Sequence, residues 1–229
     1  EALATGEGEF ENSWRAVTPD DDCTIIYTSG TTGPPKGCVI SHGNYRAMLD
    51  MVNSTSVIEP EDVTYLYLPL AHSFALLIQL GSFDLGATLA YWERDPLKIL
   101  PNLAEVKPTY FPSVPRIFEK IYTAATANVE KEGGLKKVIF NWAVRVGRKY
   151  RERERSGKPI GPLLKRKYEF ADEKVLSKIR NLFGGRLKLA VSGAAPINPE
   201  ILRFFDACGV LVLEGWGMTE TSTAATIST

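Results

Sequence analysis

The sequence predicts an α/β fold in which helices flank a layered, mostly parallel β-sheet. Short β-branched or aromatic runs alternate with longer helical segments along the chain. The spacing of this alternation is typical of a largely parallel sheet. The 229 residues include 44% hydrophobic and 10% aromatic residues, a composition that supports a core and excludes a disordered or collagen-like chain.

The first elements follow an acidic, polar stretch at residues 1–20, which we expect to form a surface lead-in. Residues 23–28 (Cys-Thr-Ile-Ile-Tyr-Thr) are β-branched and aromatic, which predicts a strand. A loop of Gly, Thr and Pro follows at 29–37, and a second strand is expected at 39–40. Residues 44–52 combine helix formers with apolar side chains at helical spacing, which predicts the first helix.

Strand and helix signals alternate through the rest of the chain. Short apolar runs predict further strands at 63–68, 88–92, 109–111, 187–191 and 210–213. Further helices are expected at 74–80, 95–106, 115–132, 135–155, 165–182 and 198–207. The pair Asp95-Pro96 is a cap followed by Pro, and Ser113 is expected to cap the helix that begins at Pro115. Gly133-Gly134 and a linker at 156–162 separate the long helices.

One uncharged stretch tests whether the chain crosses a membrane. No residue from Leu66 to Phe83 is charged, and a spanning helix needs about 20 apolar residues. Pro69 and Gly81 interrupt the stretch, and its first residues have the character of a strand. A buried strand followed by a buried helix is therefore favoured over a spanning helix, and we expect a soluble chain.

The cysteines and the N-terminus indicate a reducing compartment. Cys23, Cys38 and Cys208 are odd in number and lack zinc-type spacing, which argues against a disulfide framework. The first residues have neither the basic start nor the apolar stretch of a secretory signal. We therefore expect a cytoplasmic protein. Because the chain lacks an initiating Met and ends just past a motif, we expect it to be a piece of a longer protein.

Charge is balanced over the whole chain but not along it. The chain has 27 Lys and Arg residues and 27 Asp and Glu residues. Residues 131–180 contain sixteen bases and six acids, a net charge of +10. Residues 1–22 contain seven acids and one base. The basic segment therefore requires a local explanation.

The strongest chemical signal is the loop Tyr27–Gly37 (Tyr-Thr-Ser-Gly-Thr-Thr-Gly-Pro-Pro-Lys-Gly). It follows a strand and contains three Gly, four Ser or Thr, and one Lys. Glycines let backbone N–H groups approach an anion, hydroxyls add donors, and Lys36 adds a positive charge. A polyphosphate is therefore the expected ligand. The loop is not a Walker A motif, because Lys36 lies between Pro35 and Gly37.

This loop resembles the nucleotide-phosphate loop of the adenylate-forming (AMP-binding) superfamily, which includes acyl-CoA synthetases. The resemblance implies that the loop binds the β- and γ-phosphates of ATP and that Thr28 lies next to Mg²⁺. The implied phosphate-binding residues are Thr28, Ser29, Gly30, Thr31, Thr32, Gly33 and Lys36.

A second motif, Glu214–Glu220 (Glu-Gly-Trp-Gly-Met-Thr-Glu), lies near the C-terminal end of the chain. Its aromatic ring can stack on a base, Thr219 can bond a phosphate, and Glu220 can bind a hard cation. It resembles the superfamily's Tyr-Gly-Met-Thr-Glu motif, with Trp216 in place of Tyr, so a phenol oxygen is missing. The resemblance implies a magnesium site at Thr28 and Glu220. The implied nucleotide contacts are Glu214, Gly215, Trp216, Gly217, Met218 and Thr219.

Two other segments carry the same resemblance. Ala190–Pro196 resembles the turn that lies along the adenine, and its small residues would admit a flat base: Gly193, Ala194 and Ala195. Leu68–Phe74 resembles the segment near the acyl carboxylate, which implies that His72 lines the acyl–adenylate junction in a positional role. By residue type alone, a His beside an apolar run is more often a core residue. The implied catalytic residues are Lys36, His72 and Thr219.

The segment Lys107–Tyr122 resembles long-chain fatty-acid–CoA ligases, a subgroup that also carries a helical insert. The resemblance implies that residues 1–229 form an incomplete N-terminal nucleotide- and acyl-binding domain, with a basic helical insert at 131–182. The C-terminal domain with its catalytic Lys is expected to be absent, so the isolated chain is expected to show little or no ligase turnover.

The implied reaction joins a fatty acid to coenzyme A at the expense of ATP. The carboxylate attacks the α-phosphate of Mg²⁺-ATP to give acyl-adenylate and pyrophosphate, and coenzyme A then displaces AMP. Two alternatives remain open. One is a fatty-acyl-AMP ligase that donates to a carrier protein, and the other is a non-enzymatic module that binds nucleotide or a lipid surface.

The basic insert has several interpretations. Its bases in the long helices include Arg145, Arg148, Lys149, Arg151, Arg153, Arg155, Lys165, Arg166 and Lys167. Anionic lipid attracts such residues at about 1 kcal/mol each, which suits peripheral membrane contact. A solvated face with Arg–Glu pairs, or contact with the polyanionic coenzyme A, explains the same charge. Nucleic acid is not expected, because no stacking aromatics are interleaved.

Overall fold

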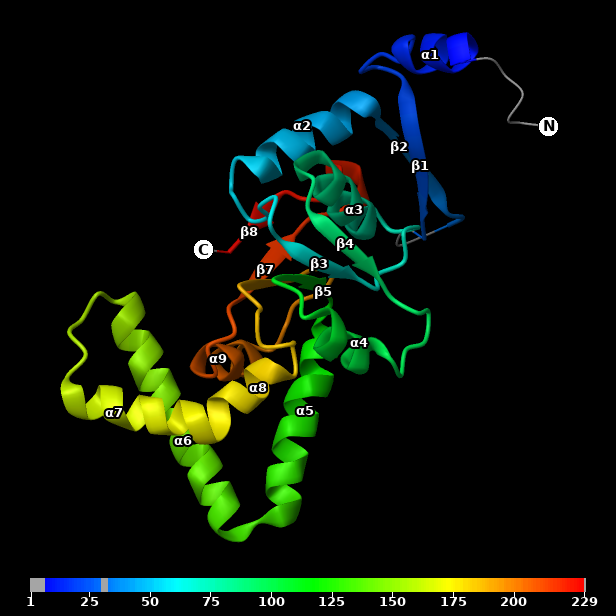
Figure 1. Ribbon diagram of the computed structural model, residues 1–229. Coiled ribbons are helices and arrows are strands. Elements are labelled where there is room, and N and C mark those ends of the chain that lie inside the picture. Colours follow the sequence, from blue (N-terminus) through cyan, green and yellow to red (C-terminus); the bar gives the residue numbers. More distant parts are fainter. Residues whose placement is uncertain (1–6, 30–32, 229) are drawn as a thin grey trace.

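The computed structural model describes residues 7–29 and 33–228 as a six-stranded sheet with helices on both faces and a separate two-stranded hairpin (Figure 1). The strands are β1 (Asp22–Thr28), β2 (Lys36–Ser41), β3 (Val63–Leu66), β4 (Thr88–Tyr91), β5 (Tyr110–Ser113), β6 (Leu189–Ser192), β7 (Val212–Trp216) and β8 (Thr226–Ile227). The α-helices are α1 (Glu7–Arg15), α2 (His42–Asn53), α3 (Ser73–Leu85), α4 (Ile99–Val106), α5 (Pro115–Glu132), α6 (Gly134–Arg155), α7 (Pro162–Ala171), α8 (Ser177–Asn181) and α9 (Pro199–Ala207). A π-helical segment (Asp172–Leu176) joins α7 to α8, and a 3₁₀ turn (Thr219–Thr221) follows β7.

The main sheet has the strand order β4-β3-β5-β6-β7-β8. Every neighbouring pair is parallel except β7 and β8. The predicted α/β class with a mostly parallel sheet is therefore confirmed. Strands β3, β5 and β6 are buried along almost their whole length, as expected for parallel strands that are covered on both faces.

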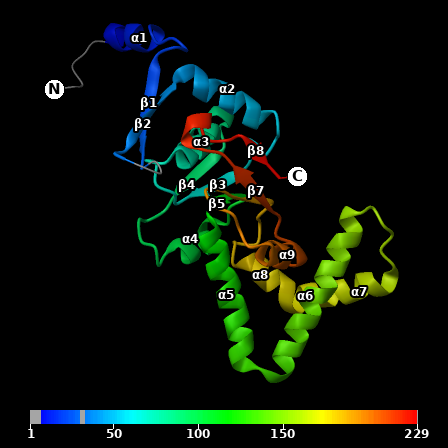
Figure 2. The same cartoon turned by 180° about the vertical axis from the view of Figure 1, so that it is seen from behind.

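The sheet lies between two layers of helices. In Figures 1 and 2, α2 and α3 lie on one side of the sheet, and α4, α5 and α9 lie on the other. The core on the second side contains fully buried aromatic rings, among them Phe118, Phe183 and Phe205. Phe205 meets the other two edge to face, with ring centroids 5.8 Å and 5.5 Å apart. Each such pair contributes about 0.5–1.5 kcal/mol beyond the area that it buries.

Helices α5, α6 and α7 form an arm that extends away from the sheet (Figures 1 and 2). Gly147 lets α6 approach α9 closely, because a Cβ at this position would lie 2.2 Å from the carbonyl oxygen of Ala207. Tyr150 of α6 stacks on Tyr168 of α7 with ring centroids 3.8 Å apart. These contacts fix α6 against both of its neighbours.

The hairpin was only partly predicted. Lys36 and Gly37, expected in a loop, belong to β2, which pairs with β1 in antiparallel register outside the main sheet. The predicted surface lead-in contains the exposed helix α1. The short strand β8 was not predicted.

One predicted helix cap and two predicted helix starts are wrong, although α5 begins at Pro115 as predicted. The N-cap of α5 is Val114, whereas Ser113 ends β5 and places its Oγ 2.7 Å from Oη of Tyr67. Helix α4 begins at Ile99, because Asp95 closes a turn by accepting a hydrogen bond from the Leu97 amide at 2.9 Å. The helix expected at 165–182 begins earlier, at Pro162, where the fixed φ of Pro suits a first helical position, and it includes the π-helical segment.

The uncharged stretch from Leu66 to Phe83 is divided between β3 and α3, as predicted. Within residues 7–29 and 33–228, no helix has the length and apolar character needed to cross a membrane.

Candidate active site

A cavity of about 1060 Å³ opens at the carboxyl edge of the main sheet. Its lining comes from the ends of β3, β6 and β7, the hairpin, α2 and α3. One part of the lining is polar and exposed, and includes Lys36, His72 and Glu220. Another part is apolar and buried, and includes Leu77 and Ile78 of α3. Because the carboxyl edge of a parallel sheet is the usual place for ligands in α/β folds, this cavity is the candidate site.

The hairpin places two predicted phosphate-binding residues side by side. Thr28 ends β1 and pairs directly with Lys36, the first residue of β2, and both line the cavity. Gly33 has φ +86, a left-handed conformation that favours glycine. Ser29 and Gly33 are exposed and do not line the cavity. The remaining predicted residues of this loop lie outside the described part of the chain: Gly30, Thr31 and Thr32.

The turn after β7 brings the second motif to the same cavity. Trp216 ends β7, lines the cavity and is 60% exposed, so its ring is available for stacking. A Cβ on Gly217 would lie only 1.5 Å from the carbonyl oxygen of Thr223, so only glycine permits this turn. The Thr219–Thr221 turn packs against β2. This packing brings Thr219 and Glu220 to the hairpin that carries Lys36.

The turn after β6 forms another wall. Gly193 and Ala194 line the cavity, and Ala194 has φ +68, a left-handed conformation that is strained for a residue with a side chain. Ala195 and Glu214, also predicted to contact nucleotide, do not line the cavity. The Glu214 carboxylate instead accepts a hydrogen bond from the Ile197 amide at 3.2 Å. The nucleotide-binding roles of Ala195 and Glu214 stay predictions.

His72 lies at the start of α3 and lines the cavity. It is the N-cap residue of α3, but its side chain makes no capping hydrogen bond. The residue is exposed, and its imidazole has no hydrogen-bond partner among the described residues. His72 is therefore available to a ligand rather than being part of the core.

Two lining residues were missed by sequence reasoning. Thr223 is 7% exposed, has φ +92, and carries a buried Oγ1 with no partner among the described residues. Tyr67 is buried beneath the cavity, and its Oη lies 2.7 Å from Oγ of Ser113. Burial raises the pKa of Tyr67, so its hydroxyl stays protonated at neutral pH. Neither residue stands out in the sequence, because the position of each depends on contacts between distant segments.

The donors around the cavity fit a magnesium-bound polyphosphate. The described residues contain no group of three or more His, Cys, Asp or Glu side chains that could hold a metal ion by themselves. Mg²⁺ is commonly held by one or two carboxylates together with substrate phosphates and water. The oxygens of Glu220 and Thr28 suit such a shared site, and Lys36 supplies positive charge for the phosphates.

Comparisons with known proteins agree with this geometry. A family model described as "AMP-binding enzyme" matches residues 2–229. The chain is 38% identical over 89% of its length to the peroxisomal long chain acyl-CoA synthetase 6 of Arabidopsis thaliana. It is 37% identical over 99% of its length to the putative fatty-acid–CoA ligase fadD11 of Mycobacterium tuberculosis, and 37% identical over 92% to long-chain-fatty-acid–CoA ligase 5 of Rattus norvegicus. It spans only 28%, 40% and 30% of these relatives.

Solved structures show the same fold. The adenylation domain of a carboxylate reductase from Mycobacterium chelonae matches 91% of this chain with a TM-score of 0.66 and 25% identity, over 28% of its own chain. A carboxylic acid reductase didomain from Segniliparus rugosus, in complex with AMP, matches 89% with a TM-score of 0.61 and 26% identity, over 25% of its own chain. With the nucleotide-loop residues and the β7 turn gathered at one cavity, and a family match over nearly the whole chain, the chain belongs to the AMP-binding enzyme family.

Proposed function

We propose that the protein containing this chain is an ATP-dependent acid–thiol ligase that activates a long-chain fatty acid as its acyl-adenylate and transfers it to coenzyme A. One observation carries the proposal. A single cavity joins a polar, exposed end suited to a polyphosphate with a buried, apolar end suited to a hydrocarbon chain. The names of the relatives support the same activity.

The polar end supplies charge stabilisation where pyrophosphate leaves. Lys36 and the hydroxyls of Thr28 and Thr219 line this part of the cavity. Groups already placed around a leaving phosphate stabilise its developing charge without rearrangement. When bound, Mg²⁺ supplies further positive charge for the phosphate oxygens, and Glu220 with Thr28 would hold it. The exposed ring of Trp216 would stack on the adenine, beside Gly193 and Ala194.

The apolar end suits an acyl chain. Ile58, Leu77 and Ile78 are buried side chains that line it, and Gly81 leaves space beside α2. Each methylene group removed from water here contributes about 0.8 kcal/mol of binding free energy. His72 lines the same cavity at the N-cap of α3, the helix that supplies Leu77 and Ile78 to the apolar wall, and we assign it to position the acyl carboxylate at the junction.

The reaction requires the two substrates to meet at the cavity. The fatty-acid carboxylate attacks the α-phosphate of ATP, and the bond to pyrophosphate breaks. The thiol of coenzyme A then attacks the acyl carbon, and AMP leaves. The residues of this chain orient the reactants and neutralise charge; they form no covalent bond with either substrate.

Isotope exchange between pyrophosphate and ATP tests the first step in the intact protein. We expect exchange that depends on a long-chain fatty acid and that falls strongly in Lys36→Ala. Absence of fatty-acid-dependent exchange would refute the proposal. Release of AMP that requires an acyl carrier protein rather than coenzyme A would identify the carrier-donating alternative.

We also propose that the protein works in the cytoplasm, with its basic helical insert at a membrane surface. The net charge of +10 over residues 131–180 supports the membrane contact. The three free cysteines support a reducing compartment such as the cytoplasm. Fractionation of cells into soluble and membrane-bound material, before and after a salt wash, tests it. Recovery in organelle interiors would contradict the location.

A further inference from the structure

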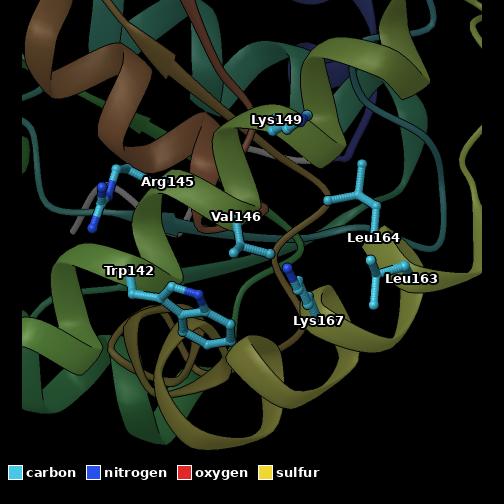
Figure 3. Close-up of a pocket in the computed structure, with 7 residues that line it drawn as sticks. All are labelled: Trp142, Arg145, Val146, Lys149, Leu163, Leu164 and Lys167. Carbon is cyan, nitrogen blue, oxygen red and sulfur yellow. The ribbon is translucent and has the colours of Figure 1, made fainter.

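A second hollow, separate from the active-site cavity, lies between α6 and α7 (Figure 3). This α6–α7 groove has a volume of about 310 Å³. Its lining residues are Trp142, Arg145, Val146, Lys149, Leu163, Leu164 and Lys167. None of them lines the nucleotide cavity, and the arm that carries them points away from the sheet (Figure 1).

The floor of the groove is apolar and preformed. Val146 is buried, Trp142 and Leu164 are half-buried, and Leu163 is 67% exposed. The stacked pair of Tyr150 and Tyr168 holds the two helices together, and the Trp142 ring meets Phe170 of α7 edge to face at 6.0 Å. The groove therefore requires no rearrangement of α6 and α7 before a ligand binds.

Three cationic side chains surround this apolar floor. Arg145, Lys149 and Lys167 are exposed, and none of them forms an ion pair within residues 7–29 and 33–228. In Figure 3, the Lys167 side chain points toward Val146, Lys149 lies at one end of the groove, and Arg145 lies at its outer edge. The groove therefore presents positive charge that the described residues do not neutralise.

Some other bases of the insert form ion pairs. Arg151 pairs with Glu154, Arg155 pairs with Asp206 at 2.7 Å, and Arg180 pairs with Asp172 at 2.6 Å. A solvated face with Arg–carboxylate pairs therefore accounts for part of the basic insert. It does not account for the three cations around the groove.

Exposed apolar side chains extend the groove along α6. Leu135 is 73% exposed and Val138 is 60% exposed. They precede Trp142 by seven and four residues, so the three side chains share one face of the helix. A soluble phosphate would neutralise the cations but leave these apolar side chains and Leu163 in water. An anionic lipid surface accommodates both the cations and the apolar side chains, because basic side chains reach the headgroups while apolar side chains enter the boundary of the acyl layer.

We infer that the α6–α7 groove binds an anionic phospholipid headgroup at a bilayer surface, with Arg145, Lys149 and Lys167 contacting the phosphate and Leu163 entering the acyl layer. This inference rests on the proposed membrane contact and gives that contact a specific site. It is independent of catalysis at the nucleotide cavity.

Vesicle co-sedimentation tests the inference. The intact wild-type protein is compared on vesicles of phosphatidylcholine alone and of phosphatidylcholine mixed equally with phosphatidylglycerol. The groove variant is Arg145→Gln/Lys149→Gln/Lys167→Gln. Its matched control is Lys158→Gln/Lys178→Gln/Arg186→Gln, which removes the same charge from exposed residues that do not line the groove. Circular dichroism and thermal unfolding confirm that both variants fold.

We expect the wild type to bind the anionic vesicles and not the neutral ones. Because each basic residue near the surface strengthens binding about fivefold, the groove variant is expected to bind about a hundredfold more weakly, and the control less than tenfold more weakly. For the apolar contact, Leu163→Asn is expected to weaken binding more than Leu97→Asn, whose parent side chain is 80% exposed elsewhere.

Equal losses in the groove and control variants would overturn the site while leaving a general electrostatic contact with the membrane. Failure of the wild type to bind anionic vesicles would overturn the site and the proposed membrane contact together. Lipids with brominated acyl chains give a second readout that does not depend on the Gln variants. We expect them to quench tryptophan fluorescence in the wild type and less so in Trp142→Phe; equal quenching in both proteins would also contradict the site.

Discussion

The backbone of Gly193 lies directly against the ring of Phe74, so that a Cβ on Gly193 would come within 3.1 Å of Cε1 of Phe74. This contact joins the end of β6 to the start of α3, the two elements that carry the proposed adenine and acyl walls. Because a Cβ at that distance is tighter than ordinary van der Waals contact, any side chain here requires a shift of the Phe74 ring, which lines the cavity.

We therefore predict that Gly193→Ala raises the KM for the fatty acid and lowers the free energy of unfolding by about 1 kcal/mol. Steady-state kinetics of the intact protein and urea unfolding measure the two effects. The control is Gly215→Ala in the same cavity, where a Cβ would meet Val191 Cγ1 at 3.4 Å and needs little adjustment. Equal effects of the two substitutions would show that the Phe74 ring does not limit the site.

Gly81 leads to a prediction about acyl chain length. It lies within α3, and a Cβ there would meet Leu49 and Ile58 at 3.7 and 3.9 Å, which are ordinary contacts. A leucine would extend beyond them into the apolar end of the cavity. If it excludes about two methylene groups, the KM of long-chain acids is expected to rise about fifteenfold in Gly81→Leu.

Medium-chain acids should be affected much less, which a kinetic comparison across chain lengths will show. The control Gly81→Ala fills little space and is expected to stabilise α3 by about 0.5–1 kcal/mol. A uniform rise in KM for acids of every length would place the acyl chain elsewhere.

The parts of the fold that depend on local pattern were predictable from the sequence. The strand–helix alternation gives the parallel sheet, and Pro69 correctly separates β3 from α3. The antiparallel pairing of β2 with β1 was not predictable. Its register depends on a turn that is longer than the two-residue turns with a recognisable hairpin signature.

Residues whose roles depend on distant contacts were also beyond the sequence. Ser113 looks like a helix cap, but Pro115 suits the helix start and the Ser113 hydroxyl pairs with Tyr67, 46 residues away. The position of Thr223 depends on the missing side chain of Gly217. The loop at 27–37 and the motif at 214–220 could be assigned to one site only through the family resemblance. No local pattern in the sequence specifies that β2 contacts the turn after β7.

Lys36 is expected to contribute to turnover without contributing to stability. It is exposed and forms no ion pair in the part of the chain that the structure describes, so Lys36→Ala should leave the melting temperature nearly unchanged. Loss of a charge that is aimed at a leaving phosphate is expected to lower kcat/KM for ATP about 100- to 1000-fold.

Lys120→Ala is the matched control, since Lys120 is also exposed but lies on α5, outside the cavity. Initial-rate measurements with varied ATP distinguish the two variants. If both variants keep wild-type kcat/KM, the hairpin does not hold the phosphates. A large fall in the melting temperature of Lys36→Ala would instead indicate a structural role.

Asp62 links the amino-terminal ends of β3, β5 and β6, at the edge of the sheet opposite the cavity. Its carboxylate accepts hydrogen bonds from Thr109 Oγ1 at 2.7 Å and the Glu59 amide at 2.9 Å, and it lies 3.0 Å from Nζ of Lys188. Burial alone raises the pKa of Asp62, but the hydrogen bonds from Thr109, Lys188 and Glu59 outweigh it and lower the pKa overall. A carboxyl whose pKa is lowered by folding stabilises the protein above its unfolded pKa of about 3.9, and this contribution disappears as the pH falls through the folded value.

Asp62→Asn is therefore expected to lower the free energy of unfolding by about 2 kcal/mol at neutral pH, because a neutral amide keeps the shape but loses the charge-assisted bonds. The difference from wild type should shrink as the pH falls below about 4, since the wild-type carboxyl then becomes protonated as well. Urea unfolding at a series of pH values measures this convergence. Glu61→Gln removes an exposed neighbouring carboxylate and should change stability by less than about 0.5 kcal/mol. A deficit in Asp62→Asn that stays constant down to about pH 2 would mean that packing, and not ionisation, is responsible.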